Sequence, residues 1–239
     1  MSALLPTARA GALWSHRARA ELDAAARFGS VAEGLAALGT PRPIIDLARR
    51  AVEDEQRHHL RCAELARCFD TDPGPAPVVH APSLDVGSND LRARVLHELV
   101  AMSCITETLS TALLIEMRAR ATDPLVRDVV HHVLRDEVDH ARLGWAYLEA
   151  GVDPSLLARV SERLPGMLRD TASEELFSDA PDPPGATTLA GLGGLPRSTR
   201  CQIFASTMRE VVFPGLQRHG LDTWPAQRWL DARVPARSP

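Results

Sequence analysis

The strongest constraint on the fold of this chain is a five-residue pattern that occurs twice. The sequence of 239 residues reads DEQRH from Asp54 and DEVDH from Asp136, which is Asp-Glu-x-x-His in both cases. Residues three apart on an α-helix lie about 60° apart on one face, so the Glu and His of each copy can hold one metal ion from a single turn. One copy alone is weak evidence, because both residue types are common on helix surfaces. Two copies favour two halves of one site.

The rest of the chain has the periodicity of helices. Alanine, leucine and arginine dominate, and apolar residues recur at spacings of three and four. Gly, Pro and Asp mark the expected ends of these helices. The predicted helices cover residues 7–38 (with residue 14 as the alternative start), 43–69, 90–121, 124–150, 155–177 and 197–217. Residues 178–196 are predicted to be loop, and the tail from Leu221 is predicted to be irregular.

The first four helices form two hairpins joined by one long connection. The connection, DTDPGPAPVVHAPSLDVGSND at residues 70–90, is rich in turn residues and is expected to be a crossover or loop. The predicted fold class is therefore all-α, a four-helix bundle of two antiparallel hairpins over residues 7–150. Residues 151–239 are predicted to form a helical extension packed on the bundle.

A di-metal site in such a bundle also needs one inward Glu from each of the two remaining helices. In an antiparallel hairpin, two residues lie at the same depth when the turn lies midway between them. Glu21 is the partner that this rule selects for Glu55, because residue 38 lies halfway between them, where LGTP begins. Glu107 is selected for Glu137, because residue 122 lies halfway, inside ATDP. Other glutamates of the third helix would place the midpoint inside a predicted helix.

Charge supports the grouping of these residues. Four buried carboxylates are unfavourable unless they are paired or bind metal, and two divalent ions would balance them. The Asp of each copy is turned about 100° from its Glu, toward the neighbouring helix. Because metal-bound imidazoles usually donate their second N–H to a carboxylate, we expect Asp54 to support His140 and Asp136 to support His58. The alternative is that both aspartates are solvated surface charges.

These residues resemble the ferritin-like superfamily, in particular its carboxylate-bridged di-iron branch with two Glu-x-x-His motifs. The resemblance runs from about Arg17 to Glu149 and includes ELDAAARF, AVEDEQRHHLRCAELA, CITETLSTALL and VVHHVLRDEVDHARLGWAYL. It implies a ferritin-like fold and two iron ions, or an iron–manganese pair. The six ligands that it implies are Glu21, Glu55, His58, Glu107, Glu137 and His140. No CxxC pair follows the bundle, so the rubredoxin-like centre of rubrerythrins is missing.

A hydroxyl group near Glu107 is a further candidate for the reaction. Oxygenases and desaturases of the superfamily place a hydroxyl residue about one turn after this Glu. In this chain, Thr111, or Ser110, resembles that residue in its position. We therefore predict Thr111 as a catalytic residue. The alternative is that its hydroxyl bonds to the backbone carbonyl four residues before it.

Three other side chains near the motifs are weaker candidates. His59 lies about 100° from His58 around its helix and is expected to be exposed. His132 is a candidate extra ligand, and Tyr147, the only tyrosine, is expected to pack rather than to carry a radical.

The sequence supports three classes of function. The first is a di-iron oxidoreductase that activates O₂ or peroxide and oxidises a small organic substrate, with an external electron donor. The second is a ferroxidase, an iron-handling protein or a peroxide scavenger. The third is a helical bundle without catalysis. A homodimer is compatible with each.

Composition excludes some partners. The 27 basic and 31 acidic residues give a net charge of −4 without a basic block, which argues against nucleic acid. Charges interrupt the apolar stretches, and we expect a cytoplasmic protein without a membrane span. The spacing of the four cysteines fits neither a metal knuckle nor a disulfide scaffold, so buried free thiols are expected.

Overall fold

The computed structural model describes residues 6–74 and 90–234, and this part of the chain is all helix, turn and loop, without a strand. The predicted all-α class is confirmed. The first part of the chain contains α1 (Pro6–Ala37), α2 (Arg42–Cys68), α3 (Leu91–Leu99), the π-helix η1 (Val100–Glu107), α4 (Thr108–Arg120) and α5 (Pro124–Glu149). Most of the predicted connection at residues 70–90 lies outside the described residues.

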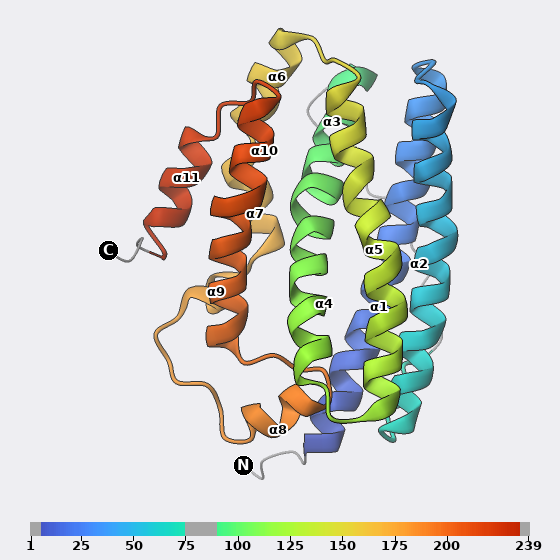
Figure 1. The fold of residues 1–239 in the computed structure, drawn as a ribbon, viewed down its shortest axis with the longest axis vertical. Coiled ribbons are helices and arrows are strands. Elements are labelled where there is room, and N and C mark those ends of the chain that lie inside the picture. Colours follow the sequence, from blue (N-terminus) through green and yellow to red (C-terminus); the bar gives the residue numbers. More distant parts are fainter. Residues whose placement is uncertain (1–5, 75–89, 235–239) are drawn as a thin grey trace.

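Four long helical segments lie side by side (Figure 1). They are α1, α2, α5 and the continuous run α3–η1–α4. Along the ring, α1 packs on α2, α2 on α5, α5 on η1 and α4, and α3 on α1. This arrangement is compatible with the predicted bundle of two antiparallel hairpins.

Both hairpin turns lie where the sequence predicts them. In the first turn, the amides of Gly39 and Thr40 donate to the carbonyls of Ala36 and Leu35 at 3.1 Å. Gly39 has φ +67°, a left-handed conformation that glycine adopts without strain. In the second turn, the Asp123 carboxylate accepts from the first amides of α5, and Pro124 occupies the first turn of that helix.

The third long segment contains a π-helix that the sequence did not predict. In a π-helix, backbone hydrogen bonds join residues five apart. Two threonine hydroxyls make bonds of the same spacing: Thr106 Oγ1 donates to the Ala101 carbonyl at 3.0 Å, and Thr108 Oγ1 donates to the Ser103 carbonyl at 3.3 Å. The π-helix ends at Glu107. Short π-helical segments inside α-helices occur frequently at functional sites.

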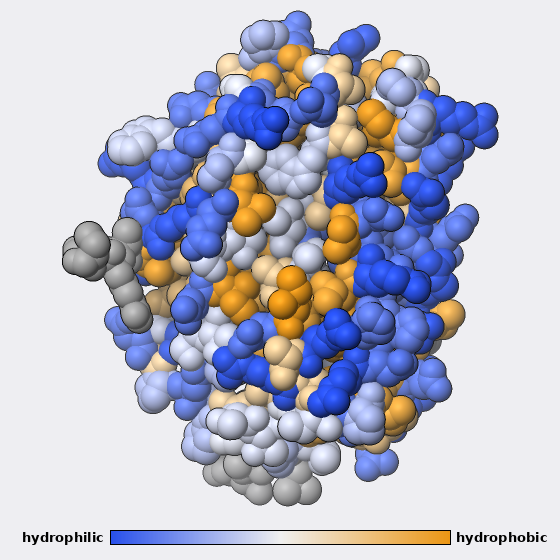
Figure 2. All heavy atoms as spheres, in the orientation of Figure 1, coloured by the Kyte–Doolittle hydropathy of each residue, from blue (hydrophilic) through white to orange (hydrophobic). Residues whose placement is uncertain are grey.

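Residues 154–234 pack on one side of the bundle, next to α4 (Figure 1). They form α6 (Pro154–Ser161), α7 (Leu164–Thr171), the 3₁₀-helix η2 (Glu174–Phe177), α8 (Ala186–Gly191), α9 (Arg197–Thr207), the π-helix η3 (Met208–Val212), α10 (Phe213–Arg218) and α11 (Trp224–Asp231). One apolar core contains side chains from both parts, for example Ile105 of η1 and Phe204 of α9. On the face shown in Figure 2, apolar groups gather over the middle of the molecule and hydrophilic groups surround them.

Three predictions for the extension need correction. The single helix predicted at residues 155–177 is divided, because Pro165 can begin a helix but cannot continue one. The predicted loop contains α8, where Gly191 accepts a hydrogen bond from the Thr122 amide at 3.0 Å. The predicted irregular tail contains α11, because Ala226 and Leu230, four residues apart, are fully buried.

The run Leu91–Arg120 also differs from the sequence analysis. By length and composition alone it is long and apolar enough to cross a membrane, although charges were expected to interrupt every apolar stretch. More than half of its apolar part is buried, against α5 and α9 among others. A core helix of a bundle passes the same test, so this finding is weak evidence for a span.

The four cysteines are free. Cys62 and Cys104 are buried as expected, but Cys68 is exposed and Cys201 is half-buried. The prediction of buried thiols is therefore correct for only two of them.

Candidate metal centre

All six predicted ligand side chains are buried in the middle of the bundle. Glu21 comes from α1, Glu55 and His58 from α2, Glu107 from the end of η1, and Glu137 and His140 from α5. Two groups of ligand atoms form, each with all its atoms within 4.8 Å of one another. The first group is Glu21, Glu55, His58 and Glu137, and the second is Glu55, Glu107, Glu137 and His140.

Glu55 and Glu137 belong to both groups, and each is 1% exposed. The two groups therefore form one cluster with two shared carboxylates. Each group has in addition one carboxylate and one imidazole of its own. Four carboxylates and two imidazoles from four helices would suit two metal ions, because di-metal carboxylate bundles use the same set of ligands.

Each imidazole has one nitrogen on the cluster and the other on an aspartate of the opposite motif. His58 Nδ1 lies 3.3 Å from Glu55 Oε2, and its Nε2 lies 3.3 Å from Asp136 Oδ2. His140 Nε2 likewise lies 3.2 Å from Asp54 Oδ2. The structure thus contains both expected crossed pairs. An Nε2–H that donates to aspartate leaves the Nδ1 lone pair facing the cluster, as a metal ligand requires.

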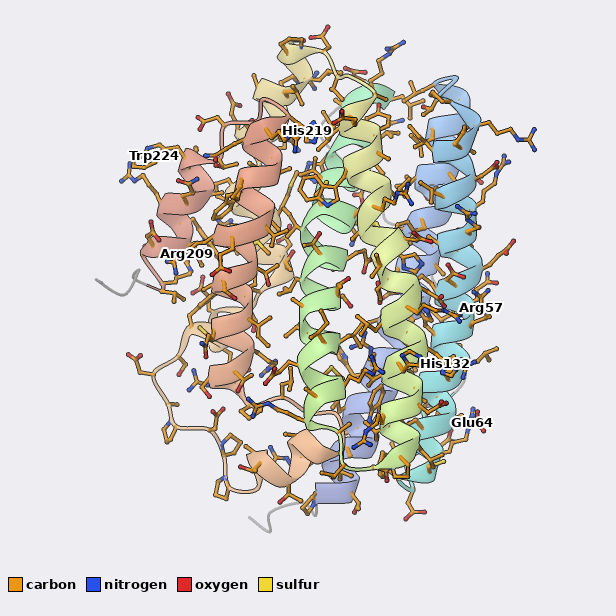
Figure 3. The ribbon with its side chains drawn as sticks, in the orientation of Figure 1. Arg57, Glu64, His132, Arg209, His219 and Trp224 are labelled. Carbon is orange, nitrogen blue, oxygen red and sulfur yellow. The ribbon has the colours of Figure 1, made fainter. Side chains whose placement is uncertain are left out.

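Arg57 ties the two aspartates together outside the cluster. Its guanidinium pairs with Asp54 and lies 3.9 Å from Asp136 Oδ2. Arg57 lies on α2 (Figure 3), and about half of its side chain is exposed. Arg135 Nε donates to Asp136 Oδ1 at 3.2 Å, so arginines balance the charges of both aspartates.

Three buried atoms of the cluster lack a hydrogen-bond partner within the part of the chain that the structure describes. They are Glu55 Oε1, Glu137 Oε2 and His140 Nδ1. His140 Nδ1 lies 3.0 Å from Glu55 Oε1 and 3.3 Å from Glu137 Oε2, but without hydrogen-bond geometry. Buried polar atoms are nearly always partnered. Two carboxylate oxygens and one imidazole nitrogen, which are atom types that bind transition metals, point at one another and therefore fit a bound ion.

Glu98 provides a contrast, because it is equally buried but lies outside the cluster. Its Oε2 accepts from two nitrogens of Arg27, at 2.7 and 3.2 Å. An ion pair accounts for that carboxylate. Among the residues that the structure describes, only Arg17 pairs with the four carboxylates of the cluster, so most of their charge requires another partner.

Without metal, bound protons and the positive charge of His140 offset part of the negative charge of the four carboxylates. Burial raises the pKa of Glu21 to about 8, and burial together with the charges of Glu137 and Glu55 raises the pKa of Glu107 well above its ordinary range. Burial also opposes ionisation of Glu137, but its contacts with His140 outweigh this and lower its pKa to about 2. For His140, burial is outweighed by contacts with Asp54, Glu137 and Glu55, which raise its pKa. Metal binding would displace these protons.

Arg17 is a site residue that the sequence analysis missed. Its Nε donates to Glu21 Oε1 at 2.9 Å, and its Nη2 lies 3.9 Å from Glu137 Oε1. Its side chain is only 20% exposed. The available signal was the spacing of four residues to Glu21, but that spacing is also typical of exposed ion pairs on helices.

A cavity of about 800 Å³ adjoins the cluster on the side of Glu21, Glu107 and Glu137. Arg17, Ser110 and apolar side chains of α1 and α4 line its inner part, and the segment between η2 and α9 forms its outer wall. That wall rests on Trp14, whose Nε1 donates to the Leu192 carbonyl at 2.9 Å. The C-terminal extension thus helps to enclose a pocket beside the candidate metal centre.

The hydroxyl that faces the cluster is that of Ser110. Ser110 Oγ donates to Glu137 Oε1 at 3.3 Å and lines the cavity. Thr111 Oγ1 instead donates to the Glu107 carbonyl at 2.8 Å, and Thr111 is not among the residues that line the cavity. The Thr111 hydroxyl therefore makes the backbone hydrogen bond given as the alternative, and Ser110, the second candidate, is the residue whose hydroxyl contacts the cluster. A catalytic role for either hydroxyl stays a prediction.

The weaker candidates lie outside the cluster. His59 is half-buried rather than exposed, and its Nδ1 lies 2.7 Å from the Ala18 carbonyl. His132 lies outside both ligand groups, on α5, with its Nδ1 2.9 Å from the Asp128 carbonyl (Figure 3). Tyr147 packs against the apolar core, as expected.

Comparison of the chain with protein-family models gives no match, and comparison with curated proteins gives none either.

Proposed function

We propose that the chain is a non-haem di-iron oxidoreductase, or its iron–manganese equivalent, that uses O₂ or peroxide to oxidise a small organic molecule. The observation that carries this proposal is that two ligand groups share Glu55 and Glu137 and lie beside a cavity of about 800 Å³. A structural carboxylate cluster needs no adjoining pocket, whereas an enzyme needs room for a substrate next to its metals.

Six side chains would hold the metals: Glu21, Glu55, His58, Glu107, Glu137 and His140. Iron in such a site supplies redox chemistry with O₂ or peroxide. The protein supplies the positions of the ligands. Asp54 and Asp136 fix the imidazoles, and Phe28, with its ring centroid 5.4 Å from that of His140, packs against one of them.

The pocket would bind the organic substrate and shield it from water. Ser110 supplies a proton donor on Glu137 at the inner end of the cavity. The wall between η2 and α9 limits access of water from the outside. A cytoplasmic location and an external electron donor remain part of the proposal.

The first test is metal content followed by reaction. Protein loaded anaerobically with Fe(II) and freed of excess metal is expected to retain two ions per chain. On mixing with O₂ it is expected to consume O₂ and develop a transient visible absorption. Fewer than one tightly bound ion per chain in the folded protein would contradict the proposal.

The same experiment separates the ferroxidase alternative. Repeated oxidation of added Fe(II), with release of Fe(III) and without an organic substrate, would favour iron handling. Oxidation that stops once the two bound ions have reacted favours an enzyme that needs an organic substrate for turnover.

A further inference from the structure

We propose that the cavity binds a substrate with one carboxylate and an apolar body, and that Arg17 receives the carboxylate. This inference rests on the proposed function, since it assumes that the cluster holds two divalent ions. It identifies the class of substrate and assigns a substrate-binding role to a residue outside the six ligands.

The first argument is the position of the guanidinium. Arg17 lines the cavity, and its Nη2 lies 3.4 Å from Ser110 Oγ and 3.9 Å from Glu137 Oε1. Within the described residues, the hydrogen-bond partner of its Nη1 is the sulfur of Met117, at 3.9 Å. The five N–H groups of an arginine form a planar fork that matches a carboxylate. Only Nε, which donates to Glu21, has a close carboxylate partner.

The second argument is charge. Four carboxylates balance two divalent ions, and Arg57 and Arg135 balance the two supporting aspartates. Arg17 then adds a positive charge that no described side chain of the metal-loaded cluster offsets. Arginine does not lose its proton in proteins, so the charge persists at any physiological pH. An anionic ligand at the inner end of the cavity would remove the imbalance.

The third argument concerns the other cations of the cavity, which are already bonded or lie in solvent. Arg9 Nη1 donates to the Pro184 carbonyl at 3.2 Å, and the Arg197 guanidinium donates to the Ser178 and Ala180 carbonyls. Arg200 is exposed. One inner cation fits a single negative charge better than a phosphate ester, which usually engages several cations.

The fourth argument is the surface around Arg17. Leu13, Trp14, Ala20, Leu113 and Met117 line the cavity next to it, and its lining is mainly apolar. An apolar body attached to the carboxylate would extend along these side chains. The carbons next to the carboxylate would then lie beside Glu107 and Glu137, where the metals would be.

The test measures binding rather than turnover. 4-Phenylbutyrate and its neutral counterpart 4-phenylbutan-1-ol are titrated calorimetrically into anaerobic Fe(II)-loaded protein and two loaded variants. The variants are Arg17→Gln and, as the matched control, Arg19→Gln, since Arg19 lies on the same helix and donates to Ser15 outside the cavity. Circular dichroism and metal content are measured for every sample.

Loaded wild-type protein and Arg19→Gln are expected to bind the carboxylate at least tenfold more tightly than the alcohol. Arg17→Gln with two ions per chain is expected to lose this preference. Equal affinity for both probes, no binding of either, or a preference that survives in Arg17→Gln would each overturn the inference. The last result would indicate a carboxylate bound by the metals alone.

The two failures are distinguishable. Wild-type protein that retains two ions but shows no preference refutes the role of Arg17 and leaves the proposed function standing. Wild-type protein that retains no metal refutes the proposed function, and this inference with it.

Discussion

The two halves of the candidate centre have the same ligands but different surroundings. In the α1–α2 half, Glu21 lies on a regular α-helix and has an arginine partner. In the other half, Glu107 ends a π-helix and has no arginine partner among the described residues. The crossed pairs Asp54–His140 and Asp136–His58 are nearly identical in length.

The difference separates two roles. The repeated features are the Asp-Glu-x-x-His turns and one further Glu in each half, and these residues would hold the proposed metals. What is not repeated is Arg17, the π-helix and Ser110, and these features lie around the cavity on one side of the cluster. The repeated residues are therefore expected to control metal content, and the unrepeated ones to control what binds beside the metals.

The largest effect is expected from the two shared carboxylates. Glu55→Ala and Glu137→Ala each remove a ligand from both groups, so both should reduce tightly bound iron from two ions per chain to less than one. Atomic emission spectroscopy of the purified variants measures the iron content per chain. The control is Glu64→Ala, since Glu64 is exposed on the same helix as Glu55 (Figure 3). Metal content that stays at two in either variant would contradict the shared role.

The supporting aspartates test whether the halves are equivalent. Asp54→Ala and Asp136→Ala should each lower metal affinity about 10- to 100-fold, because the imidazoles lose the group that orients them. The two losses should be similar, since the crossed pairs are similar. Asp139→Ala, at an exposed position of α5, should leave affinity unchanged. A competition assay with a chelator gives the values, and a loss in only one variant would break the equivalence.

Two glycines test the packing of the π-helix. A Cβ on Gly144 would lie 2.6 Å from Cys104 Sγ and 2.9 Å from the Leu99 carbonyl, whereas a Cβ on Gly29 of α1 would meet nothing within 4 Å. Gly144→Ala should lower the free energy of unfolding by about 1 to 3 kcal/mol through overpacking. Gly29→Ala should leave it unchanged or raise it by roughly 0.5 to 1 kcal/mol. Urea denaturation distinguishes them, and equal effects would show that α5 does not need this close approach.

The last test concerns the metal-free protein and the dependence of its stability on pH. The pKa of Glu21 is raised from 4.5 to about 8, so between these values the folded protein keeps a proton that the unfolded chain releases. The raised pKa of His140 acts in the same direction above about 6.5. Stability should therefore fall as pH rises from 5 to 8, by up to about 1.4 kcal/mol per pH unit for each such proton. Glu137, with a pKa lowered to about 2, acts in the opposite sense only at lower pH.

Thermal melts of metal-free protein across this range check the direction. Glu21→Gln should make the decline shallower, and Glu64→Gln should not. A melting temperature that rises between pH 5 and 8 in the wild-type protein would contradict the assigned proton positions.

The metal-binding half of this account follows from local spacing in the sequence. The turns near residues 38 and 122 select Glu21 and Glu107, and the helical angle between Asp and Glu predicts the crossed pairs. These features depend on regular helices, so counting along the chain is sufficient to place them.

The pocket could not be predicted in the same way. Arg17 has the ordinary spacing of a surface ion pair, but its side chain contacts α4 and lines a cavity whose other wall is the segment before α9. The π-helix changes the register of the residues that follow Glu107, and there the hydroxyl that reaches Glu137 is that of Ser110 rather than Thr111. α8 and α11 are short helices stabilised by packing on other elements, which local periodicity does not reveal.

The central claim is that one buried cluster holds two metal ions through two shared carboxylates. Anomalous scattering from crystals of iron-loaded protein, recorded at the iron and manganese edges, tests it most directly. The account predicts two peaks inside the bundle, with Glu55 and Glu137 each contacting both ions and His58 and His140 contacting one each. The absence of any peak among these side chains, with metal bound elsewhere or not at all, would contradict it.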